Sequence, residues 1–286
     1  MAMVAEVLRR NAWLSEWVAF VTQVLFAISI EVGDDIGRGV LAQHGTAVGI
    51  RNAHNIVAFE AAHGFWVEPG WQRFFEQPTQ VFGLNLTWPD MAHLMNVIYI
   101  GGHVFVTMAT ALWIYTHHRS VFPFVRNIMI ATNALALCVY ENFPVAPPRL
   151  TTNLIYDHHA FTFQDTIFGL VGSTGRFGAA PVGYNEFSAM PSVHMAWALV
   201  VAGCLFILVR PIIFKLAGIL YPAAMLLAVV VTGNHYIADA LVSGIIVVLA
   251  TALALILEYV WAAARGPRYS GVLTAMRSGS SCLGTV

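Results

Sequence analysis

The sequence predicts an all-α membrane protein, a six-transmembrane-helix bundle with interfacial helices after the first span. Three observations support this prediction: the composition, the length of the apolar segments and the distribution of Lys and Arg. Of the 286 residues, 58% are hydrophobic and only 10% are charged. A soluble domain of this size needs a more highly charged surface, so the composition indicates an integral membrane protein with one membrane domain.

Six apolar segments are long enough to span a bilayer, because a hydrocarbon core of about 30 Å needs about 20 apolar residues in a helix. The third is the weakest, since Arg126, Asn127 and Asn133 interrupt it. The first could be a signal peptide, but no convincing small-x-small cleavage site follows it, so we expect it to be retained. The six segments cover about residues 13–30, 91–115, 124–142, 191–209, 211–232 and 236–262.

The charge distribution predicts the orientation in the membrane. With a cytoplasmic N-terminus, nine of the fourteen Lys and Arg residues lie on the cytoplasmic side, and most acidic residues lie outside. The positive-inside rule therefore favours a plasma-membrane protein with residues 1–12 and the tail 263–286 in the cytoplasm and residues 13–262 as the membrane domain. The nine basic residues are Arg9, Arg10, Arg119, Arg126, Arg210, Lys215, Arg265, Arg268 and Arg277.

Residues 45–75, between the first two predicted spans, carry apolar residues at helical intervals. Trp66 and Trp71 suit the headgroup region of a membrane. We expect one or two interfacial helices here, on the outer face, that shield the bundle. A gate for lipid entry is the alternative role.

Segment 143–190 is long and rich in Pro, Gly and polar residues. Long loops in compact proteins are usually functional, so we expect an extracytoplasmic active-site loop. Three polar clusters lie near it: Arg149, the pair Ser192 and His194, and "TGNHYIAD" at residues 232–239. Because the fourth and fifth spans form one hairpin, the start of the fourth and the start of the sixth lie on the same side of the membrane.

These clusters contain the groups that phosphoryl transfer needs. His235 and Asp239 are four residues apart, so one helical turn lets the carboxylate accept a hydrogen bond from one ring nitrogen and leaves the other nitrogen nucleophilic. His194 is a candidate general acid. Arg149 and the backbone N–H groups near Ser192 are suited to phosphate oxygens. Together they predict a phosphohistidine mechanism, although a lone membrane histidine is often only an interhelical hydrogen-bonding group.

The motifs "MPSVH" and "HYIAD", with an upstream "PPR", resemble the signatures of the type-2 phosphatidic acid phosphatase superfamily, particularly the branch that includes inositol phosphorylceramide synthases. The resemblance covers roughly residues 45–262. It implies a six-helix bundle in which His235 attacks phosphorus, Asp239 orients it and His194 protonates the leaving group. Ser192 and Arg149 would bind the phosphate.

The sequence departs from the family pattern at four positions. Val193 replaces the usual glycine, Ala228 and Val229 stand where a Ser-Arg pair is expected, and Asn142 stands where a lysine is expected. The phosphate site is therefore poorer in cations than in a typical phosphatase of the superfamily. The candidates that would compensate, or bind substrate in another way, are Arg176, the pair His158 and His159, Asn142, Tyr236 and Asp165. For Asp165 the alternatives are contact with a polyol acceptor and capping of a short helix, and capping is favoured.

The predicted function is transfer of a phosphoryl group or phospho-headgroup from a membrane lipid to water or to an inositol-like polyol. No Walker loop, dinucleotide fingerprint or zinc spacing appears, so we expect no cofactor, no metal and no nucleic-acid partner, and the oligomeric state is left open. A catalytically weak lipid-binding or scaffold relative is the alternative, because the expected Lys and Ser-Arg pair are missing. A transporter ranks last, since the polar groups gather at one end of the spans.

Overall fold

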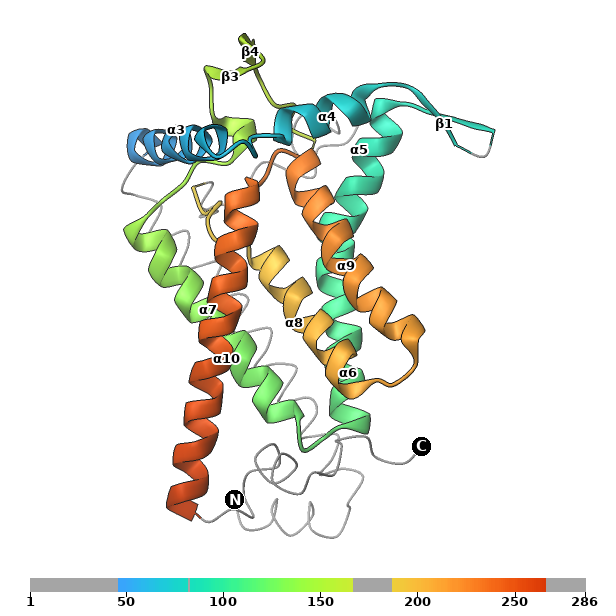
Figure 1. Cartoon of the computed structure of the whole chain (residues 1–286). Coiled ribbons are helices and arrows are strands. Elements are labelled where there is room, and N and C mark those ends of the chain that lie inside the picture. The colour runs from blue at the N-terminus through green and yellow to red at the C-terminus, as the bar shows by residue number, and fades with distance from the viewer. Residues whose placement is uncertain (1–45, 82, 167–186, 266–286) are drawn as a thin grey trace, which may run out of the picture.

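The computed structural model describes residues 46–81, 83–166 and 187–265, and this part of the chain is mostly helical (Figure 1). Helices α3 (Thr46–Ala62) and α4 (Glu68–Glu76) lie across one end of a bundle of longer helices. The first bundle helix is continuous from Trp88 to His117 and consists of α5 (Trp88–Asn96), the π-helical segment η2 (Val97–Val106) and α6 (Thr107–His117). The others are α7 (Phe122–Asn142), α8 (Val193–Leu208), α9 (Ile212–Val231) and α10 (Ile237–Arg265).

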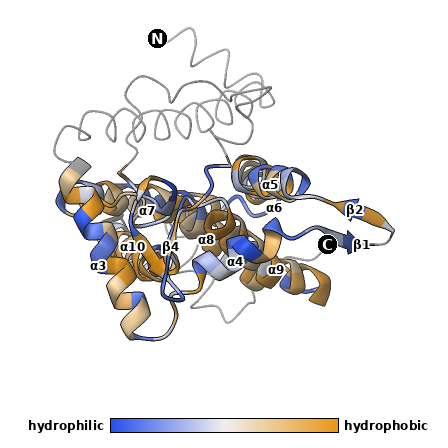
Figure 2. Cartoon of the chain, turned by 90° about the horizontal axis from the view of Figure 1, so that it is seen from above, coloured by the Kyte–Doolittle hydropathy of each residue, from blue (hydrophilic) through white to orange (hydrophobic). Residues whose placement is uncertain are grey.

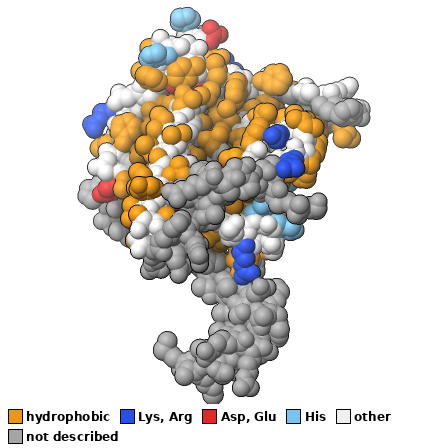
Figure 3. Space-filling model, turned by 60° about the horizontal axis from the view of Figure 1, so that its bottom comes forward, with side chains coloured by type: hydrophobic (Ala, Val, Ile, Leu, Met, Phe, Trp, Pro, Cys, Tyr) orange, Lys and Arg blue, Asp and Glu red, His pale blue; other side chains and the backbone are white. Residues whose placement is uncertain are grey.

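Four of the described helices are long and apolar enough to cross a membrane, so the protein is a multi-pass membrane protein. They are Trp88–His117, Phe122–Asn142, Ile212–Val231 and Ile237–Ala264. Large apolar side chains of α10, including Leu241, Ile245 and Val248, are exposed at helical spacing, as lipid contact requires. Figure 2 shows that α9 and α10 are more hydrophobic than α3 and α4. Figure 3, in which the bottom of the molecule comes forward, shows hydrophobic side chains over much of the described surface in that view.

The predicted count of six spans is not shown. The first predicted span, 13–30, and the predicted cytoplasmic segment 1–12 lie outside the described residues. Of the predicted cytoplasmic tail 263–286, the first three residues belong to α10 and the others lie outside the described residues. The predicted span 191–209 forms α8, which has only 16 residues. A helix of that length is about 24 Å long, which is less than the hydrocarbon thickness of about 30 Å.

Two short hairpins correct the all-α prediction. Strands β1 (Thr79–Val81) and β2 (Leu84–Leu86) form one antiparallel pair, and β3 (Leu154–Tyr156) and β4 (His159–Phe161) form the other. The second hairpin turns through Asp157 and His158, which have φ angles of 49° and 62°. Positive φ at both central residues matches the twist of a two-residue hairpin, but Asp-His lacks the Asn-Gly or Asp-Gly sequence that usually predicts such a turn.

Buried polar side chains attach α3 and α4 to the end of the bundle. Asn52 donates to the carbonyl oxygen of Pro144 at 2.8 Å, and Gln72 donates to that of Val231 at 2.9 Å. The side-chain oxygen of Gln72 accepts the backbone N–H of Gln164 at 2.8 Å. The segment predicted to hold interfacial helices therefore packs on the residues 144–166, and both contact the start of α10 and the end of α9.

Candidate active site

The turn between α9 and α10 carries His235. The turn begins with Thr232, whose hydroxyl donates to the carbonyl oxygen of Ala228 at 2.7 Å, and continues through Gly233 at a φ of 69°. A Cβ atom on Gly233 would lie 3.3 Å from the Cβ of Arg149. The backbone N–H of Arg149 donates to the carbonyl oxygen of Gly233 at 2.9 Å. Glycine is therefore required here both for the left-handed backbone and for the close approach of Arg149.

The Nδ1 atom of His235 has two oxygen neighbours. It lies 2.7 Å from the carbonyl oxygen of Ala189 and 3.3 Å from Oδ2 of Asp239. A carbonyl oxygen only accepts hydrogen bonds, so these partners assign the proton to Nδ1 and leave a lone pair on Nε2. The predicted contact with Asp239 is present, but the shorter bond goes to a backbone group that the sequence motifs did not indicate.

Asp239 is fully buried and serves two groups at once. Its Oδ2 atom also accepts the backbone N–H of Tyr236 at 2.8 Å. This is the capping bond that an acidic residue in the first turn makes to the residue before a helix. The same carboxylate thus starts α10 and orients the imidazole of His235.

The carbonyl of Ala189 is held in place by two neighbouring segments. The backbone of residues 187–189 pairs with Val145, with N···O distances of 2.7 Å and 3.2 Å. The hydroxyl of Tyr140 on α7 donates to the carbonyl oxygen of Pro191 at 2.7 Å. The segment that leads into α8 is therefore fixed on both sides of Ala189.

His194 lies in the first turn of α8 and is half-buried. Its ring centroid is 6.0 Å from that of His235. It stacks on Tyr99 with centroids 4.0 Å apart and an interplanar angle of 17°, and its centroid is 4.3 Å from that of His103. His103 in turn stacks on Trp197 at 4.7 Å. The two histidines predicted to cooperate are thus neighbours, and a wall of aromatic rings supports one of them.

Tyr99 and His103 are site residues that the motif analysis missed. Both are buried on η2, and π-helical segments are frequent at functional sites. A signal was available, because Asn96, Tyr99, His103 and Thr107 recur every three or four residues within an apolar span. Polar residues on one face of a membrane helix indicate that this face is buried or functional.

Ser192 is the N-cap of α8 and has no exposed surface. Its Oγ atom accepts the backbone N–H of Met195 at 3.3 Å. The hydroxyl hydrogen can still donate to an anion, because one hydroxyl both accepts and donates. Val193, in the place of the family's glycine, is buried in the apolar cluster formed with Ala136 and Tyr140.

Arg149 lies beside the turn that holds His235. Its Nε donates to the Oδ1 of Asn234 at 3.0 Å, and its Nη1 forms an ion pair with Oδ2 of Asp165 at 3.1 Å. The arginine side chain is 2% exposed and the aspartate 24% exposed. Asp165 therefore partners Arg149, a role that neither of its predicted alternatives included.

Several predicted site residues lie elsewhere. Tyr236 is fully buried, and its phenol lies 3.0 Å from the hydroxyl of Thr151, so the structure places its side chain in the core. Burial raises the pKa of Tyr236 well above its ordinary value. Asn142 is exposed at the end of α7 and donates to the carbonyl oxygen of Cys138 at 2.7 Å.

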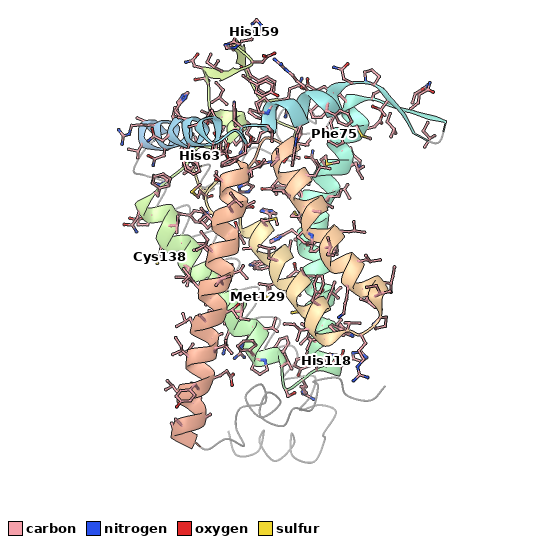
Figure 4. The ribbon with its side chains drawn as sticks, in the orientation of Figure 1. His63, Phe75, His118, Met129, Cys138 and His159 are labelled. Carbon is pink, nitrogen blue, oxygen red and sulfur yellow. The ribbon has the colours of Figure 1, made fainter. Side chains whose placement is uncertain are left out.

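The loop candidates for added positive charge are also outside the histidine pair. His158 and His159 are exposed in the β3–β4 hairpin, and Figure 4 shows His159 at its tip, beyond α3. Arg176 lies outside the described residues. Ala228 and Val229 are fully buried in apolar packing, so the positions of the expected Ser-Arg pair contribute no phosphate ligand. Within the described ranges, no group of three or more His, Cys, Asp or Glu side chains has the arrangement of a metal site.

Comparison with protein-family models gives one match. The model of the PAP2 superfamily matches residues 54–254, which is more than half of the chain. No match was found among curated proteins or among solved structures. Members of this superfamily are generally phosphatases or phosphotransferases. The matched residues include Arg149, His194, His235 and Asp239, and the chain belongs to the PAP2 superfamily.

Proposed function

We propose that the protein is a membrane lipid phosphatase or phosphotransferase that acts through a phosphohistidine on His235. The observation that carries the proposal is the hydrogen bond from Nδ1 of His235 to the carbonyl oxygen of Ala189, with Asp239 beside it. This arrangement leaves Nε2 as the nucleophilic atom, on a residue that is 5% exposed and lies next to a second histidine. Fixing the tautomer of an imidazole in this way is a common means of activating it.

In the first half-reaction, Nε2 of His235 attacks the phosphorus atom of a lipid phosphate ester, and the bond from phosphorus to the leaving oxygen breaks. His194, as imidazolium, gives its proton to that oxygen. Arg149 and the N–H groups at the start of α8 stabilise the charge on the other phosphate oxygens. Asp239 and the carbonyl of Ala189 stabilise the positive charge that develops on the ring of His235.

In the second half-reaction, an oxygen nucleophile attacks the phosphohistidine and the P–N bond breaks. His194, now neutral, takes the proton of the attacking water or alcohol. Water gives inorganic phosphate, and an inositol-like polyol gives a new phosphate ester. The mechanism uses only protein side chains and backbone groups, and no metal or cofactor enters any step.

The proposed setting is the outer face of the plasma membrane. The Arg and Lys distribution supports cytoplasmic termini, and α3 and α4 would lie in the headgroup layer above the site. In a variant without Cys138, Cys204 and Cys282, a cysteine introduced by Ser173→Cys should react with a membrane-impermeant maleimide on intact cells. A cysteine introduced by Ser270→Cys should not react, and the reverse pattern would place the site in the cytoplasm.

The phosphohistidine is tested by trapping. Purified protein is mixed with phosphatidic acid labelled in its phosphate, quenched in base and separated on a gel. We expect acid-labile label on the wild type and none on His235→Gln, with turnover lowered at least 1,000-fold because the nucleophile is lost. His159→Gln is the matched control and should label like the wild type. Full activity in His235→Gln would reject the mechanism.

The acceptor is tested in the same preparation. Adding inositol should give an inositol phosphate if the protein is a transferase with an inositol-like polyol as its acceptor. Free phosphate as the sole product, whether or not inositol is added, would make it a phosphatase.

A second candidate function is a lipid-binding or scaffold protein with weak catalysis. Two observations favour it: Arg149 is already paired with Asp165, and Ala228 and Val229 supply no cation. Such a protein would bind phosphatidic acid in vesicles but release no phosphate from it or from a polyprenyl pyrophosphate.

A further inference from the structure

Two glutamates from the helices that cross the end of the bundle are buried against the first turn of α10. Glu60 on α3 and Glu68 on α4 have no exposed surface. Oε1 of Glu60 accepts the backbone N–H of Ala238 at 2.7 Å, and Oε1 of Glu68 accepts that of Ile237 at 2.9 Å. Glutamates are almost never fully buried unless they are paired, because losing the hydration of a carboxylate is costly. A specific role for the two is therefore indicated.

The hydrogen bonds of these glutamates complete the N-terminal cap of α10. The first N–H groups of a helix have no acceptor within the helix. In α10, Asp239 accepts the N–H of Tyr236, and the two glutamates accept the next two N–H groups along the chain. Negative charge is also favourable at a helix N-terminus. Three carboxyl groups from three helices thus fix the turn that begins with His235.

Three carboxyl groups at one buried position cannot all be ionised at low cost, since like charges repel and none is well hydrated. Burial raises the pKa of Glu60 to about 10, with the hydrogen bond to Glu68 and the charge of Glu68 as the next causes. Burial also raises the pKa of Glu68, although hydrogen bonds from Glu60 and from backbone N–H groups oppose this. Burial therefore favours one proton on the pair at neutral pH, and Glu60, whose Oε2 is buried without a hydrogen-bond partner among the described residues, is the member that gains most from it.

The remaining oxygens are consistent with this placement of the proton. Oε2 of Glu60 is buried, and no donor reaches it from the described residues. A buried oxygen that no donor reaches is costly to leave ionised, so a proton on this carboxyl group is favoured. Oε2 of Glu68 accepts the backbone N–H of Val67 at 2.9 Å, so Glu68 acts only as an acceptor, which suits an ionised carboxylate.

We propose that Glu60 and Glu68 are positioning residues that share one proton and hold His235 and Asp239 in their reactive arrangement. The proposal rests on the proposed function, because the group that they position is its nucleophile. It explains why helices that cross the end of the bundle carry buried acids. The other titratable groups that face the pair are the carboxylate of Asp239 and the phenol of Tyr236.

The shared proton predicts a pH dependence of stability with a definite sign. In the unfolded chain Glu60 loses its proton near pH 4.5, whereas in the folded protein it keeps the proton up to about pH 10. Its stabilising contribution is therefore complete below pH 4.5 and is lost progressively as the pH rises towards 10. Glutamine at position 60 can still accept from the backbone N–H of Ala238, but it cannot titrate, so this dependence should disappear.

The experiment compares Glu60→Gln with Glu68→Gln, which are the same chemical change at the two members of the pair. We expect Glu60→Gln to keep kcat within about threefold of the wild type and Glu60→Ala to lower it at least tenfold, since only the amide preserves the cap. Glu68→Gln should also lower kcat at least tenfold, because the two carboxylate oxygens accept the backbone N–H groups of Val67 and Ile237 and an amide has only one acceptor oxygen. Equal effects of the two glutamine variants would overturn the assignment of the proton.

A second readout needs no activity. The thermal unfolding temperature of the purified protein in lipid nanodiscs is measured between pH 5 and 9.5. The wild type should lose stability across this range more steeply than Glu60→Gln, and parallel profiles would overturn the shared proton even if Glu60→Ala does not fold. A wild type that releases no phosphate but shows these profiles would reject the proposed function and retain the shared-proton cap.

Discussion

The two ends of the bundle are built from different kinds of buried side chain. At the site end, formed by α3, α4, residues 144–166 and the first turns of α8 and α10, the buried residues include many polar and charged groups. In the far half, around Ile114, Ile128 and Ala254, the buried cluster is apolar. Figure 4 shows Met129 and His118, which mark this half, well away from α3. Directional hydrogen bonds therefore dominate the structure of the site end, and apolar packing dominates that of the far half.

At the site end, the positions of the buried polar side chains depend on hydrogen bonds for which few other partners are available. The side chains of Gln72, Arg149 and Asn234 each bond to groups far away in the sequence, and an unsatisfied partner in such a buried place is costly. In the far half, contacts between apolar side chains are non-directional, so they stabilise the fold by buried area and close packing and do not fix individual polar groups. Substitutions at the two ends should therefore fail in different ways.

Apart from loss of the nucleophile His235, the largest effect at the site end is expected for His194→Ala. Without the general acid, hydrolysis of a lipid phosphate should fall by about 100-fold or more, because its alkoxide leaves poorly. Nitrophenolate leaves without protonation, so the hydrolysis of a nitrophenyl phosphate ester should fall much less. The measurement is kcat/KM for both esters. Equal losses on the two substrates would mean that His194 acts by packing alone.

A smaller effect is expected at His103, which contacts His194 and Trp197 through its ring. His103→Ala should lower kcat about tenfold, since an unsupported His194 loses its fixed orientation. His103→Phe should recover most of the activity, because it restores the ring. If Phe is as impaired as Ala, a ring nitrogen of His103 takes part in the reaction, and the polar region extends one turn deeper into the bundle.

The smallest effect on turnover is expected in the far half. Ile114 is fully buried there, and Ile114→Ala should lower stability by about 2 kcal/mol through the cavity that it leaves. The kcat of the folded fraction should stay unchanged. Thermal unfolding and turnover measured on one sample separate the two quantities. A tenfold fall in kcat with unchanged stability would contradict the division between the two ends.

The contacts of the site that could be predicted from the sequence are those between residues that are close together in the chain. His235 and Asp239 are one turn apart, so their contact followed from spacing alone, and the hairpin of α8 and α9 brought His194 to the same end. The carbonyl of Ala189 and the ion pair of Arg149 with Asp165 depend on the path of a long loop, which no periodicity encodes. Tyr99 and His103 belong to a polar stripe in an apolar span, which the sequence shows. Their contact with His194 is visible only in the structure.

The fold was predictable to a similar depth. The length of the apolar segments correctly indicated the four long helices. Apolar residues at helical intervals, together with Trp66 and Trp71, indicated the helices α3 and α4. The same criterion gave α8 the length of a full span, because "SAMPSVHMAW" is apolar enough to look like membrane. The residues at the start of α8 are buried by protein rather than by lipid, as the low exposure of Ser192, Val193 and Met195 shows. Hydropathy does not distinguish these two environments.

The shortness of α8 has a consequence for how a substrate arrives. Arg210 follows the end of this helix and is exposed, as expected at a membrane boundary. Measured from that boundary, a helix of about 24 Å ends about 6 Å short of the opposite edge of the hydrocarbon layer. In the proposed membrane setting, His194 would therefore be recessed within the hydrocarbon thickness. If the substrate is a membrane lipid, as proposed, its phosphate would reach His194 by a small displacement along the membrane normal. Neither substrate nor lipid product would then have to be extracted into water.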